Sequence, residues 1–242
     1  MDFRRIVLVF FLSTTLLFTS PVTSNDDAKV ALALYYESLC PYSANFIVNY
    51  LAKIFDNSII DIVDLDLIPY GNARLKANGT ITCQHGPYEC LLNTIEACAI
   101  TTWPDLTEHF KFIFCVENLV VKHKYKEWES CFQETGLNSE AVSVCYYSGY
   151  GKELELKYAA QTDALEPPHK YVPWVVVNGQ PLYEDYENFE VYLCNAYEGN
   201  SPPKACQGLT GLATKKKEAS PAHHVSLVDE LFGSNEVNKA EA

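Results

Sequence analysis

The pattern of apolar and polar residues near the start of the chain predicts a strand, a helix and a second strand. Residues 29–37 are almost continuously apolar, which is typical of a strand buried on both faces. Residues 44–55 carry apolar side chains at helical spacing, and residues 59–68 alternate between apolar residues and aspartates. This order predicts a right-handed crossover and a parallel strand pair. We expect the aspartates of the second strand to face solvent and not to bind calcium.

The middle of the chain, about residues 83–160, predicts a helical insert. Its apolar residues recur with helical periodicity, and it contains six of the nine cysteines, so we expect disulfides to pin it. The most regular helical stretches are residues 91–100, 105–116 and 139–147.

Strand character returns at residues 171–177, and a hairpin and a final helix follow. Asn178-Gly179 is the strongest short hairpin signal, and it makes residues 180–183 the returning strand. Residues 186–196 predict the last helix. Strands and helices in this order predict the α/β class.

The two ends of the chain have different compositions from the centre. Residues 1–24 have a basic start, an apolar run and a small-residue exit, which is the layout of a secretory signal peptide. We expect residues 25–207 to form one domain. Residues 208–242 show no core pattern and predict a disordered tail. The chain is therefore expected in the secretory pathway.

Charge and apolar content exclude two kinds of partner. The formal net charge of −13 at pH 7 repels phosphates, so we expect no nucleic-acid partner. No apolar run after residue 24 is long enough to span a bilayer, so we expect no membrane anchor. Asn78-Gly79-Thr80 is an N-glycosylation acceptor, which in a secreted chain predicts an exposed loop that carries a glycan at Asn78.

Cys40 is the residue most suited to chemistry. It lies between the first predicted strand and the following helix, where a thiol faces the positive end of the helix dipole and unpaired backbone amides. Both stabilise a thiolate, so we expect a lowered pKa and a nucleophilic sulfur. Pro41 is well placed at a helix start because its missing amide costs nothing there.

Pro173 supports this interpretation. It interrupts an apolar run that otherwise reads as a central strand, where proline would remove a ladder hydrogen bond. The order of elements around it makes Val172–Pro173 a candidate cis peptide bond, which would bring backbone beside the Cys40 thiol.

A longer motif gives the chain a resemblance to a known family. The segment from Cys83 to Cys98 reads CQHGPYECLLNTIEAC, and it fits the signature of the gamma-interferon-inducible lysosomal thiol reductases at every fixed position. Residues 35–41, 68–73 and 171–179 resemble the flanking blocks and the cis-proline strand of that family. The resemblance covers about residues 29–206.

The resemblance implies a thioredoxin-like fold with an inserted disulfide-rich helical subdomain, in a secreted or lysosome/vacuole-type protein. It implies reduction of disulfide-containing proteins at acidic pH without a bound cofactor. Members of the family use a Cys-x-x-Cys pair, in which the first cysteine attacks and the second resolves the mixed disulfide.

This sequence departs from the pattern at Ser43, which occupies the resolving position. A serine hydroxyl cannot displace a disulfide, so an attack by Cys40 needs an external thiol, such as glutathione or cysteine, to complete turnover. We expect Ser43 itself to be a helix-start residue with a capping hydroxyl, and the alternative is a modest hydrogen bond from its hydroxyl to the Cys40 thiolate.

The cysteine count agrees with this substitution. An odd number leaves at least one cysteine unpaired, and without Cys40 eight remain, which is enough for four bridges whose pairing is open. The disulfide candidates are Cys83, Cys90, Cys98, Cys115, Cys131, Cys145, Cys194 and Cys206.

The segment from Cys83 to Cys98 could also be read as a metal site with His85 as a further ligand. The cysteine spacings are not those of zinc sites and the compartment favours disulfides, so we predict no metal there. We expect His85 and Glu89 to hold the loop by hydrogen bonds rather than to act as acid and base.

Two functions remain open. The first is a thiol-disulfide oxidoreductase that uses Cys40 and an external thiol. The second is a catalytically impaired glycoprotein that binds or covalently traps partner proteins. Exposure of the Cys40 sulfur beside Pro173 would favour the first, and burial would argue against exchange.

Overall fold

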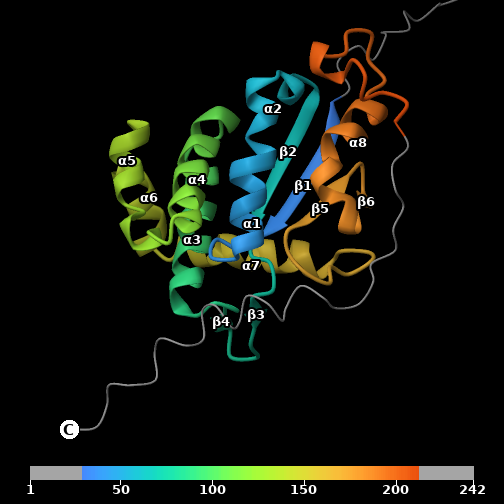
Figure 1. Ribbon diagram of the computed structural model, residues 1–242. Coiled ribbons are helices and arrows are strands. Elements are labelled where there is room, and N and C mark those ends of the chain that lie inside the picture. The colour runs from blue at the N-terminus through green and yellow to red at the C-terminus, as the bar shows by residue number, and fades with distance from the viewer. Residues whose placement is uncertain (1–28, 213–242) are drawn as a thin grey trace, which may run out of the picture.

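A four-stranded mixed sheet lies at the centre of the molecule (Figure 1). The computed structural model describes residues 29–212. The strand order is β2-β1-β5-β6, with β1 (Val30–Tyr36) parallel to β2 (Val63–Pro69). β5 (Trp174–Val177) runs antiparallel to β1 and pairs with β6 (Gln180–Pro181). The predicted α/β class and the predicted parallel pair are confirmed.

The crossover between β1 and β2 is helical, as predicted, but it is not one regular helix. It consists of α1 (Pro41–Phe46), a π-helical turn (Ile47–Leu51) and α2 (Lys53–Asp56). The sequence pattern did not indicate the π turn. α1 lies against the sheet beside α4, as Figure 1 shows.

The predicted strand over residues 59–68 is wrong in its first half. Residues Ile59–Ile62 form a 3₁₀ helix, and β2 begins only at Val63. Ser58 adopts a left-handed conformation with φ of 64°, and the Asn57 side chain accepts a hydrogen bond from the Ile59 amide at 3.1 Å. This local turn chemistry, with Ile59 and Ile62 both buried, overrides the alternating pattern.

The helical insert is present and gathers mainly at the left of the sheet in Figure 1. Cys98–Cys145 joins α3 to α6, and Cys115–Cys131 joins α4 to α5. α3 and α7 also pack on β2, which fixes the insert to the sheet. The helices are α3 (Pro87–Thr102), α4 (Leu106–Val121), the 3₁₀ turn Tyr125–Glu127, α5 (Ser130–Thr135), α6 (Ser139–Tyr147) and α7 (Tyr150–Asp163).

A small hairpin that the pattern did not predict precedes the insert. Its strands are β3 (Arg74–Leu75) and β4 (Ile81–Thr82). Asn78 is exposed in the turn between them. The insert begins just after the hairpin, where Cys83 is bonded to Cys90.

The end of the domain contains the predicted hairpin and helix in shortened form. Asn178 and Gly179 have positive φ angles of 46° and 76°, as an Asn-Gly hairpin turn requires. β6 stops at Pro181, which has no amide to donate to a ladder. Residues up to 188 then form a 3₁₀ helix (Tyr183–Asn188), so the predicted last helix is regular only over α8 (Phe189–Ala196).

Alternate residues of β1 enter two separate cores. Leu32 and Leu34 pack in one core with residues of α1, α2 and α8. Tyr35 packs in the other core with Trp174 and residues of α3 and α7. The nearly continuous apolar sequence of β1 follows from this burial on both faces.

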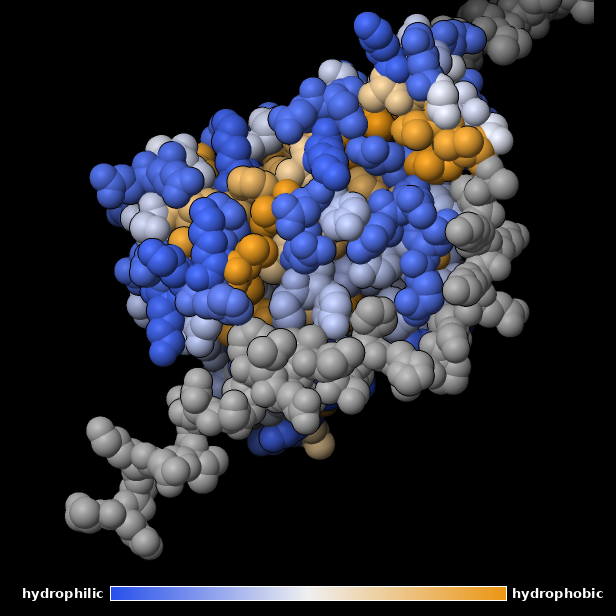
Figure 2. Space-filling model, viewed as in Figure 1, coloured by the Kyte–Doolittle hydropathy of each residue, from blue (hydrophilic) through white to orange (hydrophobic). Residues whose placement is uncertain are grey.

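Hydrophilic residues cover most of the face seen in Figure 2, with smaller hydrophobic areas between them. This distribution fits amphipathic helices whose apolar sides enter the cores. In residues 29–212 no helix is both long and apolar enough to cross a membrane.

Some predictions fall outside the described residues. The predicted signal peptide, residues 1–24, lies wholly outside them, and so does the predicted tail beyond residue 212. The first tail residues form turns after the short 3₁₀ helix Lys204–Cys206, and the Gly211 amide donates to Asn195 Oδ1 at 2.7 Å. Cys206 is bonded to Cys194 of α8, which ties this segment to the domain.

Candidate active site

Cys40 lies at the N-cap of α1, directly after the loop that leaves β1. Its amide donates to Glu37 O at 3.2 Å, and its carbonyl accepts from Ala44 N at 2.9 Å. Pro41 is the first residue of the helix, as predicted. Among the described residues Cys40 is the only free cysteine, because the other eight form four bridges.

The Cys40 sulfur lies beside the loop that contains Pro173. The Val172–Pro173 peptide bond is cis, and the thiol donates to Val172 O over a distance of 3.8 Å. The residue is only 6% exposed. The thiol and the Pro173 loop therefore share one place in the fold although they are far apart in the sequence.

Burial decides the acidity of the Cys40 thiol. Desolvation raises its pKa to about 11, and the nearby Glu37 charge adds to the rise. The amide and hydroxyl dipoles of Ser43 lower the pKa but do not offset the burial. The expected lowering of the Cys40 pKa is therefore wrong. The effect of the helix start is smaller than the effect of removing water from around the sulfur.

Ser43 is the third residue of α1 and is fully buried. Its Oγ makes no capping hydrogen bond to the backbone at the N-terminus of α1, and its hydroxyl instead acts on the Cys40 thiol, whose pKa it lowers. The expected capping role of Ser43 is therefore wrong. Its position, one turn after Cys40, is the one from which a second thiol could reach the first.

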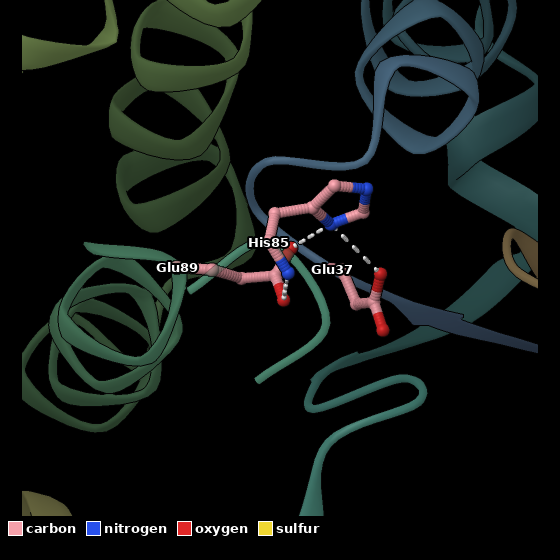
Figure 3. Close-up of side chains that lie close together, drawn as sticks. All are labelled: Glu37, His85 and Glu89. Atoms are coloured by element: carbon pink, nitrogen blue, oxygen red, sulfur yellow. Dashed lines mark hydrogen bonds and ion pairs between the residues drawn. The ribbon is translucent and has the colours of Figure 1, made fainter. Parts of the chain in front are cut away.

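His85 connects two buried carboxylates next to the Cys40 loop (Figure 3). Its Nδ1 lies 2.5 Å from Glu89 Oε2 and 3.5 Å from Glu37 Oε2. The His85 amide also donates to Glu89 Oε1 at 3.1 Å. His85 and Glu89 thus hold the loop by hydrogen bonds, as the sequence predicts.

Glu37 is the member of this cluster that was not predicted from the sequence. The feature of the sequence that could have indicated Glu37 is its position at the end of a predicted buried strand, three residues before Cys40. The two carboxylates raise the pKa of His85 to about 10, and burial raises the pKa of Glu37.

Asn93 holds the same loop from α3. Its Oδ1 accepts from the Ser38 amide at 3.0 Å and from Ser38 Oγ at 2.7 Å, and both residues are fully buried. The segment from Cys83 to Cys98 therefore holds Glu37 and Ser38, which lead into Cys40. His85, Glu89 and Asn93 of the motif therefore position the loop before Cys40, a role that their spacing in the sequence does not reveal.

A second group of buried carboxyls lies among the insert helices, and the sequence analysis missed it. Tyr36 of β1 donates its hydroxyl to Glu96 Oε2 at 2.6 Å. Burial raises the pKa of Glu96 to about 8 and raises those of Glu117 and Glu155 as well. The feature of the sequence that could have indicated these buried carboxyls is the presence of acidic residues on otherwise apolar helix faces.

The sequence model of the family described as gamma interferon inducible lysosomal thiol reductase matches residues 31–135. A gamma-interferon-responsive lysosomal thiol protein of Arabidopsis thaliana is 45% identical over 211 residues, which is 85% of this chain and 88% of that protein. The gamma-interferon-inducible lysosomal thiol reductase of Mus musculus is 36% identical over 74% of this chain and 73% of its own length.

Two solved structures share the fold at low sequence identity. The reduced form of the disulfide bond oxidoreductase DsbG from Mycobacterium tuberculosis aligns with a TM-score of 0.51 and 20% identity, covering 84% of this chain and 92% of that chain. Oxidised DsbA from the same organism aligns with a TM-score of 0.52 and 18% identity, covering 81% and 94%. The expected thioredoxin-like fold with a helical insertion is confirmed.

Proposed function

Because the chain belongs to the gamma-interferon-inducible lysosomal thiol reductase family, we propose that it is a thiol-disulfide oxidoreductase that works through the Cys40 sulfur alone. The proposed substrates are disulfide-containing proteins, and the proposed second reactant is a small external thiol such as glutathione or cysteine. No other cofactor takes part in this scheme.

The chemistry needs two external thiols for each substrate disulfide. The Cys40 thiolate attacks one substrate sulfur, the S–S bond breaks, and the other sulfur leaves and takes a proton. An external thiolate then attacks the Cys40 sulfur and releases the second substrate thiol. A second external thiolate removes the first as a small disulfide and restores Cys40. The net reaction oxidises two small thiols and reduces one protein disulfide.

One observation carries the single-sulfur mechanism. Cys40 is the free thiol of the described domain, it lies beside the Pro173 loop, and the residue one turn later is Ser43. The remaining cysteines there are consumed by bridges. A resolving thiol therefore has to come from outside this domain.

A second candidate function is supported by the burial of Cys40. The Cys40 residue is only 6% exposed, which limits the access of a protein disulfide to its sulfur. With exchange slowed in this way, the protein would act as a glycoprotein that binds partners or holds them as long-lived mixed disulfides. We propose the secretory pathway, either outside the cell or in a lysosome or vacuole, as the location of both functions, with a glycan on Asn78.

A reduction assay separates these functions. Reduction of a fluorescent disulfide substrate is measured at pH about 5 and about 7, with and without glutathione, for the wild type and Cys40→Ala. We expect activity that requires both glutathione and Cys40. Activity without an added thiol, or equal activity in Cys40→Ala, would contradict the mechanism.

The trapping function predicts a different result in the same samples. Mixed disulfides between Cys40 and the substrate would accumulate on a non-reducing gel and persist when glutathione is added. Binding that survives both reductant and Cys40→Ala would instead identify a non-covalent binding protein.

A further inference from the structure

We propose that Glu37, His85 and Glu89 form a divalent-cation site, with zinc as the cation. The ligands are His85 Nδ1 and one carboxylate oxygen from each glutamate. These three atoms lie within 4.8 Å of one another, and the residues come from two segments that are about fifty residues apart in the chain. The proposal concerns metal binding alone and does not depend on the function proposed for Cys40.

Both carboxylates are oriented before any cation binds. Glu37 Oε1 accepts from the Asn72 amide at 2.6 Å, and Glu89 Oε1 accepts from the His85 amide at 3.1 Å. Each glutamate therefore uses one oxygen to fix its position and turns the other toward the imidazole, as Figure 3 shows. Outer contacts of this kind are what orient ligands in metal sites.

The Glu37 carboxylate has one oxygen that is held only by an ion pair with His85. Its side chain is fully buried, and among the described residues its Oε2 accepts no hydrogen bond. Two buried carboxylates here share the single positive charge of one imidazole, so a divalent cation would compensate both of them more fully. The ion-pair partner of Oε2 is His85 Nδ1, at 3.5 Å.

The distances suit a small cation. Two ligands on a tetrahedral zinc are about 3.3 Å apart, given metal–ligand bonds of about 2.0–2.2 Å. The 3.5 Å between His85 Nδ1 and Glu37 Oε2 already matches this separation. Glu89 Oε2, at 2.5 Å from Nδ1, has to move outward by about 0.8 Å, and the cation takes the place of the proton between them.

The donor set selects the type of cation. One imidazole nitrogen and two carboxylate oxygens suit zinc better than calcium or magnesium, which prefer oxygen ligands alone. Cys83 and Cys90 are bonded to each other, so no thiolate competes within this loop. The His85 side chain is 35% exposed, which leaves a solvent-facing position for a water ligand.

The site would join two parts of the fold that meet at the nucleophile loop. Glu37 is the first residue after β1, and its carbonyl accepts from the Cys40 amide at 3.2 Å. His85 and Glu89 belong to the start of the insert, in the loop closed by the Cys83–Cys90 bridge. A bound cation would therefore stiffen the connection from the insert to the loop that precedes Cys40.

Zinc binding to the full mature chain tests the proposal. The protein carries Cys40→Ala so that the free thiol cannot bind metal, and it is dialysed against a chelator and then against Zn²⁺ at pH about 7. We expect one equivalent of zinc by elemental analysis and a zinc-dependent rise in Tm. Glu37→Gln and His85→Ala should each weaken binding by at least about tenfold.

Matched controls separate a built site from general affinity. His123→Asn removes an exposed histidine elsewhere, at a positive φ that asparagine tolerates, and should leave zinc binding unchanged. Co²⁺ in place of zinc should give the visible absorption of a tetrahedral nitrogen and oxygen site without a thiolate charge-transfer band.

Two results would overturn the proposal. One is the absence of stoichiometric zinc binding to the folded Cys40→Ala chain. The other is binding that is unchanged in folded Glu37→Gln. If His85→Ala fails to fold, the cobalt spectrum of the parent protein decides, because an octahedral aqua-ion spectrum would rule out the three ligands.

Discussion

At the scale of single residues, two opposing effects act on Cys40. A helix start favours a thiolate by about 0.3–1 kcal/mol in exposed settings, which is less than one pKa unit. Desolvation of a fully buried group shifts its pKa by up to several units. Cys40 is 6% exposed, so burial prevails and the pKa rises to about 11. The sequence places the thiol at the helix start but contains no direct measure of its burial.

Alkylation by iodoacetamide should show this effect. Because only the thiolate reacts, the rate at Cys40 should rise about tenfold per pH unit from pH about 6 to 9, without a plateau. Mass spectrometry of the alkylated peptide gives the rate, and free glutathione in the same tube serves as the reference. A plateau near pH 7 would show that the thiol is poised for exchange and that burial does not control it.

Ser43→Cys tests whether the missing thiol limits turnover. A cysteine one turn after Cys40 should form a disulfide with it on mild oxidation, and mixed disulfides with substrate should shorten in lifetime at least about tenfold, because intramolecular attack benefits from a high effective concentration. Peptide mapping and non-reducing gels measure both effects. Ser43→Ala is the control and should behave as wild type. Equal lifetimes in Ser43→Cys and Ser43→Ala would mean that access to the sulfur, not resolution, is limiting.

At the scale of elements, the loop before Cys40 is held by contacts that the sequence analysis could not predict. The segment from Cys83 to Cys98 is recognisable as a motif. However, no periodicity in the sequence shows that His85, Glu89 and Asn93 face the loop after β1. These contacts depend on how α3 packs against the sheet, and the packing depends on the whole insert. Strand β1 and the crossover helix were predictable because their apolar patterns are local.

The predictions that failed at this scale failed where local turn chemistry competed with a pattern. Asn57 and Ser58 redirect the chain into a 3₁₀ helix although the following residues alternate as a strand would. Pro181 ends β6 although the hairpin turn before it was predicted. In both places one or two residues outweigh a pattern that spreads over many.

Gly71 is the element-scale position most sensitive to change. Its φ is +54°, and a Cβ there would lie 2.4 Å from Glu37 Cγ. Gly71→Ala should therefore lower the free energy of unfolding by about 2–4 kcal/mol, combining backbone strain with displacement of Glu37. Urea unfolding measures the change.

Gly79→Ala is the matched control for Gly71→Ala. Its φ is +78°, but a Cβ there meets no atom within 4 Å. It should show the backbone cost alone, about 1–2 kcal/mol. Equal effects of the two substitutions would contradict a role for the contact between Gly71 and Glu37.

At the scale of the whole molecule, the insert brings uncompensated carboxyls into the interior. Glu96, Glu117 and Glu155 are almost fully buried, and the described residues include no basic group within salt-bridge distance of them. Burial raises the pKa of all three, so they retain protons in the folded state at a pH where exposed glutamates are ionised. The stability of the fold should therefore depend on pH through these buried carboxyls of the insert, and not through the Cys40 thiol.

Stability should consequently fall as pH rises. In the unfolded chain these carboxyls ionise near pH 4.5, whereas the pKa of Glu96 in the folded protein is about 8. Between these values unfolding releases protons, so folding is favoured at the acidic end, and the penalty disappears below the unfolded pKa. We expect roughly 1–3 kcal/mol more stability at pH about 5 than at 7.5, or a Tm higher by about 3–10 °C for a domain of this size.

Thermal unfolding of Cys40→Ala followed by circular dichroism across this pH range measures the effect without interference from thiol exchange. The variant Glu96→Gln/Glu117→Gln should lose a large part of the pH dependence, because neither amide titrates, whereas Glu155 and His85 keep their raised pKa values. Glu127→Gln, at a side chain that is 60% exposed, should retain the parent profile. A Tm that rises from pH 5 to 7.5 would show that paired surface carboxylates dominate, since their folded pKa values are lowered and their contribution has the opposite sign. A fall of Tm with rising pH that is smaller in Glu96→Gln/Glu117→Gln but unchanged in Glu127→Gln would instead assign the acid preference to the buried carboxyls of the insert.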